Sequence, residues 1–118
     1  MQIVNIDKAP KEPGGGKLFT GEVSHQWLVR DSNNYNAVIV NFGHGIRNKF
    51  HIHECDQLLI VTAGKGIVAT EQEQRAVEVG DVILSPAGEK HWHGAAPDSE
   101  FSHISITAKG GGMTQVED

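Results

Sequence analysis

The chain has 118 residues, a length that fits one domain built around a single hydrophobic core. Its net charge of −5, with no basic block, argues against a nucleic acid as a binding partner. Its apolar runs are far too short to cross a bilayer, so we expect no membrane partner.

The first 17 residues are expected to hold a short edge strand followed by a flexible linker. Residues 3–6 (IVNI) have the apolar, β-branched composition of a strand. Residues 8–17 (KAPKEPGGGK) contain two prolines and three consecutive glycines, which oppose regular structure.

From residue 18 to residue 108, strand-forming runs follow one another at close spacing, and no window has convincing helical periodicity. The runs are rich in β-branched residues, and Gly, Asn, Asp and Pro separate them. The expected strands are residues 19–29, 36–42, 48–53, 57–62, 66–70, 76–79, 82–84, 91–94 and 101–106. Short strands with this punctuation indicate an all-β sandwich or barrel.

The run Leu58–Val61 is apolar at every position, so both faces of its strand need cover. One face would line the interior, and the other requires a second sheet or a partner subunit. We therefore expect a homodimer or a higher homo-oligomer. Residues 109–118 are glycine-rich, then polar and acidic, and are expected to form a flexible tail.

Three histidines predict a metal site. His51 and His53 occupy alternate positions of one expected strand, and alternate side chains project from the same face about 6.6 Å apart. Two imidazoles at that spacing can converge on one ion. His91 lies in a second, distant, glycine-marked hairpin. Neutral imidazole binds zinc, copper, iron, nickel and, with oxygen partners, manganese.

Two further histidines share strand faces with these elements. His93 lies on the same face of its strand as His91, and His103 shares a face with Phe101 and Ser105. The sequence leaves open whether that last face points inward. An unligated imidazole beside a metal suits proton transfer, because it titrates near neutrality. A buried histidine bonded to a backbone carbonyl is the alternative interpretation for both.

The glycines and metal-ligating residue types recur at fixed spacings in two motifs, which resemble the signature motifs of the cupin superfamily. Those read glycine, His-x-His, Glu, glycine, and then glycine, Pro-x-Gly, His, Asn. The matching positions are Gly45, His51, His53, Gln57 and Gly64 in the first motif, and Gly80, Pro86, Gly88 and His91 in the second. Gln57 departs from the usual glutamate, and Ala95 stands where many cupins have asparagine.

This resemblance implies a small antiparallel β-barrel, a double-sheet jelly roll over residues 18–108, holding one divalent metal. The stretches 59–64 and 86–97 are similar to a branch of small single-domain bacterial cupins (cupin type 2). That branch includes cupins associated with carboxymuconolactone decarboxylases and the manganese-dependent cupin hydroxynitrile lyases.

The branch also implies roles for particular residues. The implied metal ligands are His51, His53, Gln57 and His91. Manganese is the expected ion, with iron, zinc, nickel, cobalt or copper as alternatives. His93 and His103 match extra histidines beside the metal, where they would be catalytic, and Asn48 falls where a small polar residue would bind the substrate.

Glutamine in place of glutamate bears on the chemistry. Three neutral imidazoles and an amide leave a divalent ion with its full charge, which makes it a stronger Lewis acid. We therefore expect a metal-dependent lyase that acts on a small hydroxy or oxo substrate, with hydroxynitrile-lyase-like activity. Two alternatives remain open: an Fe(II)-dependent dioxygenase of a small aromatic or diketone substrate, and a non-catalytic cupin that binds a metal or a small molecule.

The expected location is the cytoplasm. The single cysteine, Cys55, cannot form a disulfide within the chain, which is typical of a reducing compartment. The first residues, MQIVNIDKAP, lack a basic stretch followed by an apolar segment, so they show no secretory signal.

Overall fold

The computed structural model describes all of residues 1–118. Its regular structure consists of ten β-strands and one 3-10 turn, Ile6–Lys8. The strands are β1 (Glu12–Gly14), β2 (Val23–Val29), β3 (Tyr35–Phe42), β4 (His51–His53), β5 (Gln57–Thr70), β6 (Gln74–Glu78), β7 (Val82–Ser85), β8 (His91–Ala95), β9 (Phe101–Ala108) and β10 (Met113–Gln115). No helix has the length and apolar character that spanning a bilayer requires.

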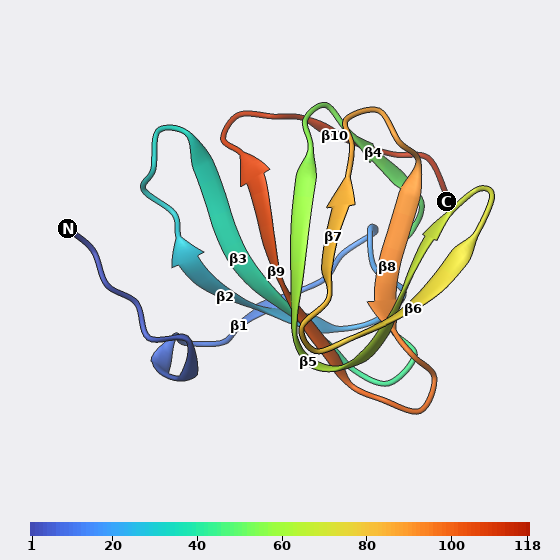
Figure 1. Ribbon diagram of the computed structural model, residues 1–118, viewed down its shortest axis with the longest axis horizontal. Coiled ribbons are helices and arrows are strands. Elements are labelled where there is room, and N and C mark those ends of the chain that lie inside the picture. Colours follow the sequence, from blue (N-terminus) through green and yellow to red (C-terminus); the bar gives the residue numbers. More distant parts are fainter.

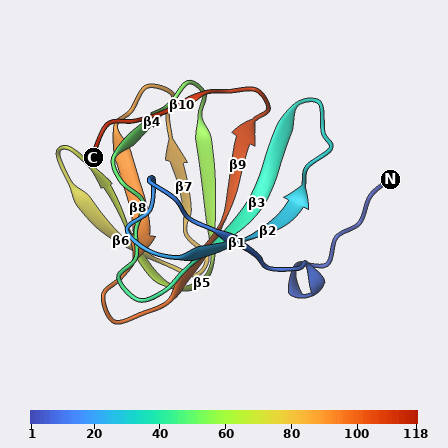
Figure 2. The same ribbon diagram turned by 180° about the vertical axis from the view of Figure 1, so that it is seen from behind.

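The long strand β5 belongs to both layers of the fold (Figures 1 and 2). Its first half pairs with β9 and β7, and its second half pairs with β8 and β6. One layer has the order β1-β2-β3-β9-β5-β7, and the other has the order β6-β5-β8-β4-β10. All pairings are antiparallel, so the all-β jelly roll expected from the sequence is confirmed.

Gly64 lies where β5 passes from one layer to the other. Its φ of +70° is in the left-handed region, which glycine adopts without steric cost. A side chain at this position would also collide with the carbonyl oxygen of Glu100. The glycine that closes the first sequence motif therefore permits the close approach of the loop between β8 and β9. This is why β5 continues as one strand where the sequence predicted two, residues 57–62 and 66–70.

The interior between the layers is part apolar and part polar. The apolar part is a cluster of buried residues from both layers: Val23, Val40, Phe42, Val61, Val77, Ala95 and Phe101. The rings of Phe42 and Phe101 each lie 5.5 Å, centroid to centroid, from the ring of His103. The hydrophobic core therefore packs directly against the histidines.

The alternation of buried and partly exposed side chains along β9 shows which of its faces points inward. Phe101 and His103 are fully buried and Ser105 is almost so, whereas Ile104 and Ile106 are partly exposed. His103 and Ser105 therefore face the interior.

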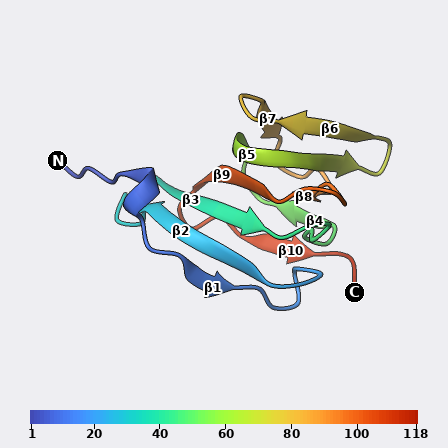
Figure 3. The ribbon, with the colours of Figure 1, turned by 90° about the horizontal axis from the view of Figure 1, so that it is seen from below.

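The chain ends differ from the prediction. Residues 3–6 form no strand, and β1 forms instead within the expected linker, paired with β2. Strand β10 forms within the expected flexible tail, paired with β4. Both strands add to edges whose backbone groups would otherwise be unpaired, a long-range effect that local composition does not encode. Figure 3 shows β1 and β10 on one side of the molecule and β6 and β7 on the other.

Candidate metal centre

Three strands carry five of the predicted site residues. Strand β4 carries His51 and His53, β5 begins at Gln57, and β8 carries His91 and His93. His51 and His91 are direct partners across β4 and β8, and their ring centroids lie 4.5 Å apart. The His51 and His53 rings are 4.9 Å apart.

Backbone carbonyls fix which ring nitrogens face the interior. The Lys49 carbonyl oxygen lies 2.6 Å from His51 Nδ1, and the Glu89 carbonyl oxygen lies 3.0 Å from His91 Nδ1. Because a carbonyl oxygen only accepts, both rings carry their proton on Nδ1 and leave a lone pair on Nε2. This is the tautomer that binds a metal through Nε2, with the outer hydrogen bond orienting the ring.

Gln57 is oriented by a residue whose role the sequence analysis missed. Its Nε2 donates to Ser105 Oγ at 2.9 Å, so its Oε1 is directed to His91 Nε2 at 3.1 Å. The one sequence signal for this contact was that Ser105 shares a strand face with His103. In this amide orientation two unprotonated acceptors face each other at 3.1 Å, and a cation that contacts both would remove their repulsion. Gln57 and His91 therefore fit a cation-binding role.

His53 also fits a cation-binding role. Its Nε2 is buried and has no hydrogen-bond partner. A buried polar atom without a partner carries a desolvation cost that a bound ion would remove. The donor set of imidazole nitrogens and an amide oxygen fits a divalent first-row metal.

Burial keeps these imidazoles in the form that binds metal. It lowers the pKa of His51 to about 4, opposed in part by the hydrogen bond to Lys49. It also lowers the pKa of His53 and of His91. Neutral imidazole is therefore the dominant form near pH 7, and its lone pair is free to bind a metal.

The three histidines with mutually close ring nitrogens are not the three expected from the sequence. Nitrogens of His51, His91 and His93 all lie within 4.8 Å of one another, and His53 lies outside this group. However, both ring nitrogens of His93 already have partners. Asn48 Nδ2 lies 3.1 Å from its Nε2, and His103 Nε2 lies 2.9 Å from its Nδ1. His53 and His93 are thus alternative third imidazoles.

Asn48 determines the protonation of the His93–His103 pair. Its Oδ1 accepts from the His93 backbone N–H at 2.8 Å, so its Nδ2 is the group that donates to the His93 ring. In neutral His93 the proton then lies on Nδ1 and is donated to His103 Nε2. Burial lowers the pKa of His103 to about 4 and that of His93 well below its ordinary value. The pair is therefore neutral near pH 7, and its lowered pKa values make it a weaker base than the near-neutral imidazoles expected from the sequence.

A pocket of about 440 Å³ reaches this centre from the side of β6 and β7. Its wall includes His91 and His93, with Val68, Val77 and Ile83 as apolar neighbours. Its charged lining residues are three acids, Glu73, Asp81 and Glu89, and one base, Arg75. The volume lies in the range of small-molecule sites.

Residues 38–107 match the family model of the cupin domain. The chain belongs to the cupin family. It is 38% identical over 111 residues to an (R)-mandelonitrile lyase from Granulicella tundricola, covering 90% of this chain and 83% of the relative. The cupin resemblance drawn from the two sequence motifs is therefore confirmed.

Two other relatives bear on this cupin. It is 34% identical over 92 residues to an acireductone dioxygenase from Picosynechococcus, a match that spans 66% of this chain and 52% of that protein. The crystal structure of a cupin-like protein from Thermotoga maritima is 35% identical, with a TM-score of 0.87, and the match covers 98% of this chain and 90% of that one. Enzymes are therefore found among its relatives.

Proposed function

We propose that this cupin binds one divalent metal, manganese first among the candidates, and acts as a lyase on a small hydroxy or oxo substrate. The observation that carries the proposal is the juxtaposition of Gln57 Oε1 and His91 Nε2, two acceptors aimed at one point, next to the neutral His93–His103 pair. The identity with a mandelonitrile lyase over 90% of the chain supports a cyanohydrin as the first substrate to test.

We assign the ligands as His51, His53, Gln57 and His91. His53 is favoured over His93 because its buried Nε2 has no partner. His93 would have to give up a hydrogen bond to Asn48 or to His103 before it could bind a metal. Choosing His53 leaves the His93–His103 pair free for proton transfer.

When bound, the metal would supply Lewis acidity toward the oxygen of the substrate, undiminished by any anionic ligand. The acceptor for the substrate proton would be His93 Nε2, to which Asn48 Nδ2 now donates. A substrate hydroxyl that replaces this amide contact would transfer its proton to Nε2, and Asn48 would donate to the substrate instead. His103, bonded to Nδ1, would share the positive charge.

With a cyanohydrin, the electron balance is simple. The hydroxyl loses its proton to His93, the carbon–carbon bond to the nitrile breaks, and the electron pair leaves with cyanide as the carbonyl forms. His93 then returns the proton to cyanide, which gives hydrogen cyanide and an aldehyde. General acid–base catalysis of this kind contributes about 10²- to 10⁴-fold to a rate.

The pocket limits the substrates that fit. Its apolar wall, including Val68, Val77 and Ile83, suits a compact aryl or alkyl group. The acidic lining residues outnumber Arg75 and so disfavour an anionic substrate over a neutral one. A neutral cyanohydrin meets both conditions.

The test uses purified protein stripped of metal and reloaded with Mn(II), Fe(II) or Zn(II). We expect the Mn(II) form to convert mandelonitrile to benzaldehyde, and we expect His91→Ala to lose both metal and activity. Activity that survives metal removal would contradict the mechanism.

A dioxygenase is the second candidate, favoured by the identity with an acireductone dioxygenase. Substrate-dependent oxygen consumption by the Fe(II) form, without mandelonitrile cleavage, would support it. No turnover of either kind would support a cupin that only binds.

We also propose that two copies associate through the outer face of the β9-β5-β7 part of the sheet. Cross-strand neighbours form a continuous apolar grid there: Ile106, Leu58 and Leu84 in one row, and Ile104, Ile60 and Val82 in the next. Val82 and Leu84 are 61% and 59% exposed. Light scattering on the eluting protein should show a dimer or larger, and Ile60→Lys should give a monomer. A monomeric wild type would contradict this proposal.

A further inference from the structure

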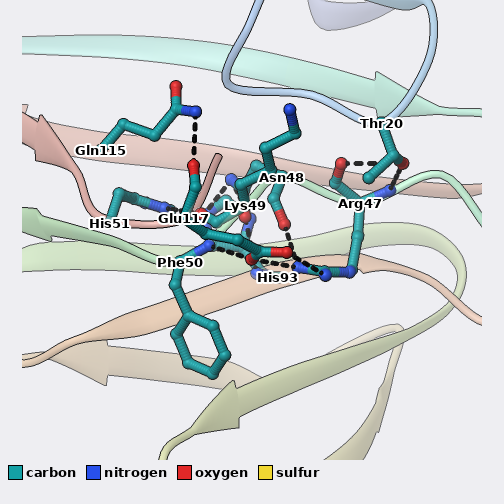
Figure 4. Close-up of polar contacts among 9 residues, drawn as sticks. All are labelled: Thr20, Arg47, Asn48, Lys49, Phe50, His51, His93, Gln115 and Glu117. Atoms are coloured by element: carbon teal, nitrogen blue, oxygen red, sulfur yellow. Dashed lines mark hydrogen bonds and ion pairs between the residues drawn. The ribbon is translucent and has the colours of Figure 1, made fainter.

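The C-terminal residues, predicted as a loose tail, make specific contacts beside the candidate metal centre (Figure 4). The carboxylate of Glu117 accepts from both terminal nitrogens of Arg47, Nη1 at 3.1 Å and Nη2 at 2.8 Å. It also accepts from the backbone N–H of Phe50 at 2.8 Å. The next residue inward, Val116, donates its N–H to the Phe50 carbonyl oxygen at 2.9 Å.

Arg47 extends this contact to both parts of the candidate centre. Its Nη1 donates to the Asn48 carbonyl oxygen at 2.9 Å. Its guanidinium lies 4.6 Å from the ring centroid of Trp92, the residue between His91 and His93. One guanidinium therefore touches the C-terminal segment, the segment that carries Asn48 and the strand that carries His91.

Strand β4 depends on the C-terminal segment for most of its pairing. It pairs with β8 only at His51 and His91. With β10 it pairs at all three of its residues, Gln115 opposite His51, Thr114 opposite Ile52 and Met113 opposite His53. The backbone positions of both β4 histidines are therefore set largely by β10.

The Glu117 contact is suited to holding this arrangement. Two parallel hydrogen bonds between arginine and a carboxylate are stronger and more directional than a single neutral bond. The two side chains are 27% and 32% exposed, so solvent screens the pair only in part. The Arg47 hydrogen bond holds the pKa of Glu117 below its usual range, which keeps the carboxylate charged.

We propose that Glu117 is a positioning residue for the metal centre: through Arg47 and the Phe50 N–H it anchors β10 against β4 and so fixes where the His51 and His53 imidazoles stand. The inference rests on the proposed metal site. It assigns Glu117 an effect on metal affinity and ligand geometry, beyond any effect on folding.

The experiment compares Glu117→Gln with Glu12→Gln in the full chain, both stripped of metal. Glu12 lies on β1 and is a matched control. Its carboxylate also forms an ion pair with an arginine, Arg30, at 3.1 Å, and its substitution removes the same charge. Co(II) is the probe, because its visible absorption reports ligand geometry. The affinity for Co(II) is measured under conditions in which each variant is shown to be folded. Lower stability alone then does not change the measured affinity.

We expect Glu117→Gln to weaken Co(II) binding by about 10- to 100-fold, the range seen when outer partners of metal ligands are removed. We also expect a changed absorption spectrum and faster amide exchange at residues 114–116. Glu12→Gln should stay within about twofold of wild type. If Glu117→Gln does not fold, Arg47→Lys tests the same link, since it keeps the charge and loses the paired hydrogen bonds.

The outcomes separate this inference from the proposed function. Wild-type affinity and spectrum in Glu117→Gln would overturn the positioning role and leave the metal site intact. An equal loss in Glu12→Gln would also overturn it, because the effect would then be general. Absence of Co(II) binding by the wild type would overturn both.

Discussion

Gln57 Oε1 lies 3.1 Å from His91 Nε2, and both atoms are hydrogen-bond acceptors. The donor groups of these two side chains, Gln57 Nε2 and His91 Nδ1, already bond to other residues. Ser105 orients the amide, and the Glu89 carbonyl orients the ring. In this amide orientation, a cation bound to both atoms would remove the repulsion between their lone pairs. We propose that a metal ion occupies this point, and each prediction below tests a consequence of that proposal.

The first prediction distinguishes His53 from His93 as the third imidazole. His53→Ala should lower bound metal to less than about a tenth of the wild-type content, because it removes a ligand. His93→Ala should keep the metal and lower lyase turnover by about 10²- to 10⁴-fold, the usual contribution of a general base. Elemental analysis beside a kinetic assay measures both. The reverse pattern would identify His51, His91 and His93 as the ligands.

The second prediction concerns the charge of the centre. Gln57→Glu should bind the metal more tightly, by about tenfold or 1.4 kcal/mol, because a carboxylate neutralises one of its charges. The geometry should be kept, since the Ser105 hydroxyl can donate to a carboxylate oxygen. Lewis acidity should fall, and with it lyase turnover. Competition with a chelator measures the affinity, and unchanged turnover with tighter binding would argue against Lewis-acid catalysis.

The third prediction is a loss of stability in acid by the metal-free protein. Burial lowers the pKa of His51 and of His103 to about 4, against 6.5 in a solvated chain. Between those values the unfolded chain binds more protons than the folded one, so the free energy of unfolding falls as the pH falls. Each such histidine contributes about 1.4 kcal/mol per pH unit in that window.

Urea denaturation at several pH values measures this slope. The contribution of these histidines to the free energy of unfolding should become constant above pH 6.5. His103→Gln should make the free energy of unfolding depend less steeply on pH below that value. A free energy of unfolding that stays constant from pH 6.5 to 4.5 would show that these side chains are not buried in neutral form.

The fourth prediction concerns the pocket. Val68 lies opposite His93 across β5 and β8 and lines the pocket wall. Val68→Phe should narrow the space for the substrate and raise KM more for an aryl cyanohydrin than for a small aliphatic one. Metal content should not change, because Val68 contributes no ligand. An equal effect on both substrates would indicate that they bind elsewhere.

Much of the centre could be predicted because its information is local. The His-x-His spacing places two imidazoles on one face of a strand, and the alternation of Phe101, His103 and Ser105 places two more polar groups together. These patterns need no knowledge of distant contacts. The glycine at position 64 is likewise marked by its motif in the sequence, whereas the two reasons for it, a left-handed φ and the close approach of the Glu100 carbonyl, appear only in the structure.

What could not be predicted depends on long-range pairing. Strand β10 forms because β4 offers it an edge, and Arg47 meets Glu117 across 70 positions of sequence. The tautomers of His51 and His91 depend on carbonyl oxygens two residues away, whose directions follow from turn geometry and not from residue type. The choice between His53 and His93 likewise depends on Asn48 and His103, which lie on separate segments.

The most direct measurement is anomalous X-ray diffraction from crystals of the metal-loaded protein, recorded at the absorption edge of the metal. We predict one peak within coordination distance of Nε2 of His51, His53 and His91 and of Oε1 of Gln57, with the Asn48–His93–His103 hydrogen bonds retained. A peak held by His93 in place of His53, or no peak among these side chains, would contradict the account.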